Sequence, residues 1–183
     1  MDNFAEQLVK RENLSSDNTK KAFIIVGIAV LGFLLSFTFV ITLGTIISIL
    51  ALVLCIGVIY GGIKLLSGFS VEYEYTVTNG EIDIDKIIAQ KKRKNLISFE
   101  AKKIKDIGGY TLETPDGNQE TTVYASDNIE SHEYYLDFEH DDYGLVRLIF
   151  SPNEKLLTAI KPFAPFTVRS KIPDYFTEGE DEE

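Results

Sequence analysis

The dominant feature of the hydrophobic pattern is one long apolar block near the start of the chain. Residues 22–63, between Lys21 and Lys64, are 42 consecutive positions without a charged side chain. One transmembrane helix needs about 20 apolar residues at a rise of about 1.5 Å each, so the block is long enough for two. The pattern predicts spans over residues 22–41 and 45–63, with the chain reversing at Thr42-Leu43-Gly44-Thr45.

Beyond this block, apolar and polar residues alternate, as is typical of half-buried strands. Val71–Thr78 alternates in this way, Asn79-Gly80 is a strong hairpin-turn signal, and Glu81–Asp85 is the expected return strand. Turn residues at regular spacing indicate an antiparallel meander of about seven strands, forming a small barrel or sandwich. The remaining strands are expected at Leu96–Glu100, Tyr110–Glu113, Glu120–Ala125, Glu133–Glu139 and Leu145–Phe150.

A single short helix is expected after the last strand. Ser151–Glu154 reads as a capping box, with Ser151 as the N-cap and Pro152 at the first helical position. One apolar stripe at helical spacing follows, and Pro162 ends it; the stripe consists of Leu156, Leu157 and Ile160. The predicted fold class is α+β: a transmembrane helical hairpin, then a β-barrel or sandwich capped by a C-terminal helix.

The ends of the chain lie outside these elements. Phe4, Leu8 and Val9 have helical spacing, which favours a brief amphipathic helix on the membrane surface; a frayed terminus explains them equally well. The last residues are acidic and are expected to be disordered. The predicted organisation is an N-terminal segment (1–21), two spans (22–66), a sheet domain (70–172) and an acidic tail (173–183).

The net charge of −10 conceals a strong segregation of charge along the chain. Eight basic residues and one acid lie between Lys86 and Lys105, whereas residues 110–146 hold ten acids and no Lys or Arg. Basic residues also flank the apolar block on both sides, and its turn carries no charge. The positive-inside rule therefore predicts a multi-pass protein of the cell membrane with both termini and the sheet domain in the cytoplasm.

The basic run is the strongest functional lead, because anionic headgroups attract each nearby basic residue by about 1 kcal/mol. It consists of Lys91, Lys92, Arg93 and Lys94, followed one connection later by Lys102, Lys103 and Lys105. We expect these residues to contact membrane lipids. A solvated loop and a protein partner are the alternatives. Nucleic acid is disfavoured, because no aromatic residue interrupts the run and the acidic stretch would repel phosphates.

Small residues recur in both spans with a spacing that lets helix backbones approach closely. The pairs are Gly32 with Ser36 and Gly57 with Gly61. They predict a homo-oligomer or a protein partner contacting the spans; packing within the hairpin and the ordinary glycine content of membrane helices are alternatives. A transport role is disfavoured because neither span contains a charged side chain, and transport routes usually contain charged or strongly polar residues within the membrane.

Residue patterns for catalysis are weak. The chain has no nucleophile elbow and no phosphate-binding glycine loop, and His132 and His140 lack metal-ligand spacing. His140-Asp141-Asp142 fits a solvated turn better than a metal site. We expect a non-enzymatic protein without metal or cofactor. The alternatives are an assembly subunit docked on another membrane protein, and an enzyme built around the two histidines and nearby carboxylates.

The complete pattern resembles a known family. After the two-span hairpin come V-E-Y-E-Y-T-V-T-N-G-E-I-D-I-D, the basic run, and L-I-F-S-P-N-E-K-L-L. This resembles a family of uncharacterised membrane proteins from Firmicutes that carry a bacterial PH-like domain, from Met1 to about Val168. The resemblance implies a PH-like fold and a membrane location, and it implies no active-site residue. PH-like domains elsewhere often bind phosphorylated lipids through basic loops between early strands, which is an analogy only.

Overall fold

The computed structural model describes residues 3–115 and 117–173, which fall into two compact units. One unit consists of Asn13–Val71 and contains the two long helices. The other joins the first twelve residues to the chain from Glu72 onward and contains both β-sheets. The helices are therefore an insertion between the first strand of the sheet unit and the rest of it.

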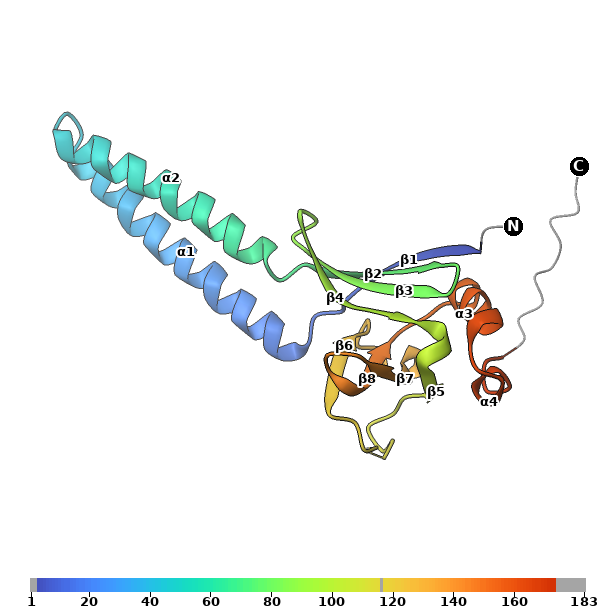
Figure 1. Cartoon of the computed structure of the whole chain (residues 1–183). Coiled ribbons are helices and arrows are strands. Elements are labelled where there is room, and N and C mark those ends of the chain that lie inside the picture. The colour runs from blue at the N-terminus through green and yellow to red at the C-terminus, as the bar shows by residue number, and fades with distance from the viewer. Residues whose placement is uncertain (1–2, 116, 174–183) are drawn as a thin grey trace, which may run out of the picture. The chain divides into compact units, whose positions relative to one another are not determined.

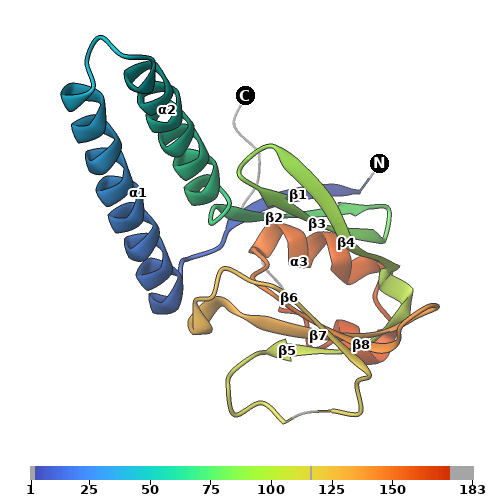
Figure 2. The ribbon, with the colours of Figure 1, turned by 90° about the vertical axis from the view of Figure 1, so that its left-hand side faces the viewer.

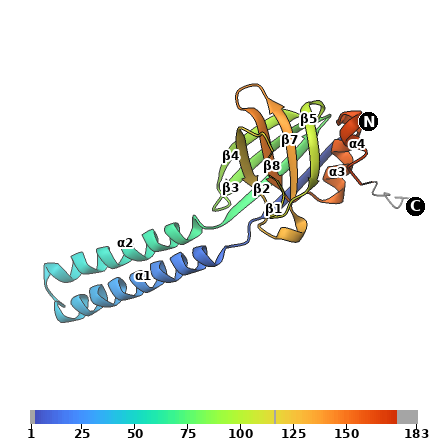
Figure 3. The same ribbon diagram turned by 90° about the horizontal axis from the view of Figure 1, so that it is seen from below.

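The helical unit is an antiparallel hairpin of α1 (Ser15–Ile41) and α2 (Ile46–Ser67), seen side by side in Figure 3. Both helices are long and apolar enough to cross a membrane. The predicted hairpin is confirmed, and Gly44 has the positive φ of 88° that its turn requires. Helix α1 begins at Ser15, seven residues before the predicted span, because the polar residues 15–21 are helical as well.

The first sheet has the strand order β1-β2-β3-β4 (Figure 1). Strand β1 pairs antiparallel with β2, so the helix or frayed end expected near the N-terminus is wrong for the described residues. The predicted hairpin turn is confirmed, with φ of 50° at Asn79 and 88° at Gly80. The strands are β1 (Phe4–Lys10), β2 (Val71–Thr78), β3 (Glu81–Ile88) and β4 (Lys92–Glu100).

The second sheet has the order β5-β7-β8-β6. Strand β6 runs parallel to β8, which departs from the expected meander, whereas β7 pairs antiparallel with β5 and β8. The strand predicted at Tyr110–Glu113 is also wrong, because β5 lies earlier and ends at Gly109. The strands are β5 (Ile104–Gly109), β6 (Thr121–Ala125), β7 (Tyr134–His140) and β8 (Gly144–Phe150).

Side chains of the two sheets meet in a common core, so the domain is a sandwich, and the described strands form no closed barrel. The ring centroids of Phe99 and Phe138 are 3.6 Å apart and stacked, and Tyr75 meets Phe150 edge-on at 5.8 Å. The Tyr75 hydroxyl donates a hydrogen bond to the Ala125 carbonyl of the other sheet. The predicted α+β class is confirmed.

Helix α3 (Glu154–Ile160) lies between the two sheets in Figure 2 and buries the expected apolar stripe. Its N-cap is Asn153, whose side chain accepts a 2.8 Å hydrogen bond from the Leu156 N–H. The predicted cap at Ser151 is wrong, because that hydroxyl donates to Asp127 instead (2.7 Å). Two short helices follow, the 3-10 helix η3 (Lys161–Phe163) and the α-helix α4 (Phe166–Arg169). The predicted disordered tail falls outside the described residues, apart from its first residue.

Candidate membrane-contact site

Both chain connections to the helices leave the first sheet at the same end. Strand β1 ends at Lys10, four residues before α1, and β2 begins at Val71, three residues after α2. In the sheet, Lys10 lies opposite Glu72. Strands β2 and β3 have eight residues each and are joined by a two-residue turn. The last residue of β3, Ile88, therefore lies beside the first residue of β2, Val71. The turn between β3 and β4 therefore lies at this end, called the helix-side end below.

The turn at the helix-side end closes a two-stranded ribbon, residues 85–95. The Lys91 N–H donates to the Ile88 carbonyl at 3.2 Å. Between them Ala89 and Gln90 both have a φ of 55°, in the left-handed region that tight turns use. Cross-strand partners along the ribbon are Lys86 with Lys94, Ile87 with Arg93, and Ile88 with Lys92. The basic run predicted from the sequence thus forms the tip and the first part of β4.

The ribbon has two chemically different faces, because side chains alternate along each strand. Lys86 and Ile88 lie on the face that continues the buried Ile82 and Ile84, and their partners Lys94 and Lys92 share it. Ile87 and Arg93 lie on the opposite face. A register shift next to Asp85 marks a β-bulge where the ribbon joins the sheet.

Carboxylates already neutralise Arg93. Its guanidinium forms an ion pair with Glu74 and lies 3.8 Å from an Asp85 oxygen. The side-chain amide of Gln90 also donates a 3.1 Å hydrogen bond to the Glu72 carboxylate of β2. Burial and a hydrogen bond with Glu6 raise the pKa of the Glu74 carboxyl, while Arg93 opposes the rise. Arg93 is therefore held against an acidic face of the sheet.

The lysines of the ribbon have no such partners. Among the residues that the structure describes, Lys86, Lys91, Lys92 and Lys94 form no ion pair, and the last three are exposed. Their charges are therefore available to an external anion. No sequence signal separates them from Arg93, because the partners of Arg93 lie on other strands.

The structure places the second predicted group of lysines elsewhere. The short helix η1 (Ala101–Lys103) follows the end of β4 that lies away from the ribbon tip. Acidic partners hold all three of these lysines: Lys102 pairs with Glu100, Lys103 with Asp141 (2.8 Å) and Lys105 with Glu139 (2.9 Å). The hydrogen bond from Lys103 lowers the pKa of Asp141. The two predicted groups therefore do not form one patch.

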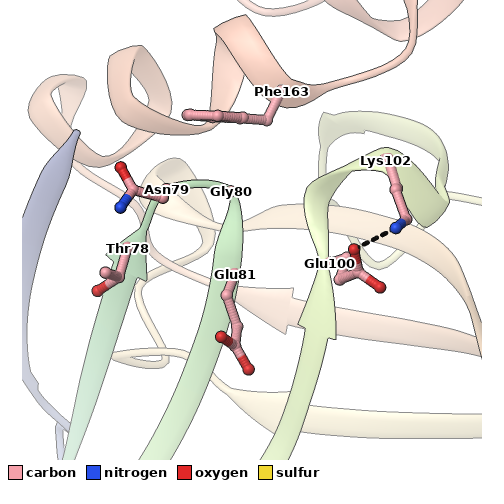
Figure 4. Close-up of a pocket in the computed structure, with 7 residues that line it drawn as sticks. All are labelled: Thr78, Asn79, Gly80, Glu81, Glu100, Lys102 and Phe163. Carbon is pink, nitrogen blue, oxygen red and sulfur yellow. Dashed lines mark ion pairs between the residues drawn. The ribbon is translucent and has the colours of Figure 1, made fainter. Parts of the chain in front are cut away.

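Lys102 also borders an open depression of about 560 Å³ at that far end (Figure 4). Figure 4 shows the Phe163 side chain beside the Asn79-Gly80 turn. Glu81 and Glu100, which are cross-strand partners, contribute two carboxylates against the single ammonium of Lys102. The depression is acidic on balance and does not suit an anionic headgroup.

The two histidines lie at opposite ends of β7 and do not share a site. The His132 Nδ1 atom is 3.5 Å from an Asp127 oxygen, and the His140 Nδ1 accepts from the Asp142 N–H (3.1 Å). The Ser151 hydroxyl donates a hydrogen bond to the same Asp127 carboxylate (2.7 Å). The described residues contain no cluster of three or more potential metal ligands.

Close packing within the helical hairpin depends on a glycine that sequence spacing did not single out. A Cβ on Gly62 would lie 2.3 Å from Ile28 Cδ1, whereas Cβ atoms on Gly32, Gly57 and Gly61 would meet nothing within 4 Å. Of the predicted packing residues, Ser36 makes a contact, with its Oγ 3.9 Å from Cys55 Sγ. The predicted use of all four residues in oligomerisation stays a prediction.

Comparison with known proteins supports one family. A family model described as "Bacterial PH-like domain (DUF6106)" matches residues 1–170. The matched region includes β1 and the apolar helices as well as both sheets. Searches of curated proteins and of solved structures gave no match.

Proposed function

Since the chain belongs to the bacterial PH-like domain family (DUF6106), as its sequence resemblance implied, we propose that it is a non-enzymatic binding module anchored in the cell membrane. The proposed ligand is the anionic headgroup surface of the cytoplasmic leaflet. The observation that carries the proposal is the placement of unpaired lysines at the helix-side end of the first sheet. Lys91, Lys92 and Lys94 would make the contact.

Connection lengths support this placement. From Ile63, the end of the predicted second span, four helical residues at about 1.5 Å each and the three-residue linker at up to about 3.6 Å per residue keep Val71 within about 20 Å of the membrane. Electrostatic attraction is screened over about 8–10 Å at physiological salt, so only groups close to the headgroups benefit. Lys102, Lys103 and Lys105 follow the other end of β4, whose nine residues span about 27 Å at about 3.4 Å per residue, and they already have acidic partners.

Basic flanking residues support the cytoplasmic orientation. Lys10, Arg11, Lys20 and Lys21 precede the first apolar span, and Lys64 closes the second. Positive charge at both outer boundaries and none in the turn is the pattern of a hairpin inserted from the cytoplasm. The same orientation gives the sheet unit access to the leaflet that carries anionic lipids.

A second candidate function is an assembly subunit that docks on another membrane protein. Gly57 and Gly61 favour it, because space around both remains open in the hairpin and a neighbouring helix could approach there. Crosslinking in native membranes should then give one defined larger species. A chain that stays monomeric would count against this role.

Photo-crosslinking tests the lipid proposal on the full-length chain. The protein is reconstituted in nanodiscs containing a trace of anionic lipid with a photoreactive headgroup, and adducts are mapped by mass spectrometry. Adducts are expected on residues 86–94. The Lys91→Glu/Lys92→Glu/Lys94→Glu variant should lose them, whereas the matched Lys102→Glu/Lys103→Glu/Lys105→Glu variant should keep them. Equal adducts in both variants would refute the proposed site.

A further inference from the structure

We propose that the ribbon meets the lipid surface with one face only, formed by Lys86, Lys92 and Lys94 around Ile88. Arg93, on the opposite face, pairs with carboxylates of the sheet and touches no lipid. This inference rests on the proposed function and specifies how it operates. It adds Lys86, which precedes the basic run in the sequence, and removes Arg93, which lies within it. Lys91 lies in the turn at the tip, between the two faces, and stays a contact residue.

The strand register assembles this face. Lys86 lies directly opposite Lys94, and Ile88 lies directly opposite Lys92. Like charges directly opposite each other destabilise a pair of strands, and no described carboxylate neutralises either ammonium group. An anionic surface would relieve this repulsion. Ile88 is half-buried between the lysines and can add apolar contact at the level of the headgroups.

The other face has the opposite charge character. Glu72 and Glu74 on β2 are only 7% and 8% exposed, and Asp85 lies beside them on β3. Arg93 and Gln90 bind these carboxylates, which ties the tip of the ribbon to the sheet. An anionic membrane would be repelled by this face. The two faces together therefore select one orientation of the ribbon.

The chemistry of the lysine face also defines the class of ligand. Lysine ammonium groups are point charges on flexible stems, unlike the fixed fork of an arginine. Three such groups on a two-stranded ribbon respond to the density of negative charge, without fixing one headgroup geometry. We therefore expect phosphatidylserine and a phosphoinositide to be equivalent when their total surface charge is matched.

A single tryptophan can report which face approaches the lipid, because the native chain contains none. Ile88→Trp and Ile87→Trp place the same reporter at adjacent positions on opposite faces of the ribbon. Each full-length variant is reconstituted in nanodiscs containing brominated lipids, which quench tryptophan at close range. Nanodiscs with phosphatidylserine are compared with neutral ones at low and high salt.

The expected result is quenching of the Ile88→Trp reporter in anionic nanodiscs, reversed by salt, with much weaker quenching of the Ile87→Trp reporter. In the Ile88→Trp background, Lys86→Gln or Lys94→Gln should each reduce the ratio of bound to free ribbon by about fivefold. Arg93→Gln removes the same formal charge from the other face, and should change this ratio less than twofold at physiological salt.

Equal quenching of both reporters, or an Arg93→Gln loss as large as that of Lys94→Gln, would overturn the face assignment while leaving lipid contact intact. A clear preference for a phosphoinositide at matched charge would overturn the assignment of ligand class. Absence of salt-dependent quenching at either position would instead refute the proposed function itself. Unchanged circular dichroism of each variant controls for misfolding.

Discussion

The carboxyl groups of Glu6 and Glu74 interact on the outer face of the first sheet, and the interaction of these two like charges is unfavourable. Burial, the hydrogen bond with Glu6 and its charge raise the pKa of Glu74. An acid whose folded pKa lies above the unfolded value stabilises the fold most at pH values below the unfolded pKa. This contribution is lost as pH rises through the folded pKa, so the pair costs stability at neutral pH.

Replacing Glu6 with glutamine should therefore stabilise the sheet unit at pH 7. The amide keeps a hydrogen-bonding group and removes the like charge, for an expected gain of about 0.5 kcal/mol in the free energy of unfolding. Thermal unfolding of the full-length protein measures it, and the gain should shrink by pH 4. Glu113→Gln removes the same charge from an exposed loop and is the control. A lower melting temperature for Glu6→Gln at pH 7 would contradict this account.

Gly80 is a residue that both conformation and packing require. Its φ is 88°, and a Cβ there would lie 2.7 Å from the Phe163 ring. Gly80→Ala should lower the free energy of unfolding by about 2–4 kcal/mol, from backbone strain and overpacking together. Gly109→Ala, where a Cβ would meet nothing within 4 Å, should cost less than about 1 kcal/mol. Equal denaturant midpoints for the two variants would refute the packing argument.

At the scale of elements, the register of the hairpin helices can be tested with the native cysteine. Ser36 Oγ lies 3.9 Å from Cys55 Sγ, so Ser36→Cys should form an intramolecular disulfide under mild oxidation. Adding Gly62→Val should slow disulfide formation several-fold, because its side chain would collide with Ile28. Adding Gly61→Val should not slow disulfide formation, because a Cβ there meets nothing within 4 Å. Gel mobility with and without reductant measures the extent of crosslinking.

The position of β4 offers a competing explanation of its basic residues. It is an edge strand, and lysines and bulges commonly protect such strands from pairing with other chains. Edge protection accounts for Lys92 and Lys94 without any lipid. It does not account for Lys86, which lies on the interior strand β3, so the effect of Lys86→Gln on lipid contact separates the two explanations.

The sequence predicted most elements but not all of their pairings. The β2–β3 hairpin was predictable because alternation and Asn79-Gly80 are local signals. Strand β1 was not, because Phe4 and Leu8 are exposed on its outer face and its partner lies beyond both helices. The parallel pairing of β6 with β8 leaves no turn signal. For the site, the basic run was visible, whereas the partners that neutralise Arg93 appear only once β2 is folded beside it.

At the scale of the whole molecule, the sheet unit is discontinuous in sequence. A fragment covering residues 71–173 lacks β1 and exposes the edge of β2, so it should aggregate or unfold without cooperativity. The same fragment preceded by residues 1–12 through a short flexible linker should unfold cooperatively. A short linker suffices because Lys10 and Glu72 are neighbours in the sheet. If the fragments with and without residues 1–12 unfold with equal cooperativity in thermal melts, β1 is dispensable for folding.

Amide hydrogen exchange of the full-length protein in nanodiscs tests the central claim, contact between the ribbon and anionic lipid, most directly. At low salt, residues 86–94 should exchange at least about tenfold more slowly in phosphatidylserine nanodiscs than in neutral ones, from several lysines at about 1 kcal/mol each. High salt should abolish the difference, and residues 101–105 should exchange alike in both lipids. Identical exchange of residues 86–94 in anionic and neutral nanodiscs would contradict the account.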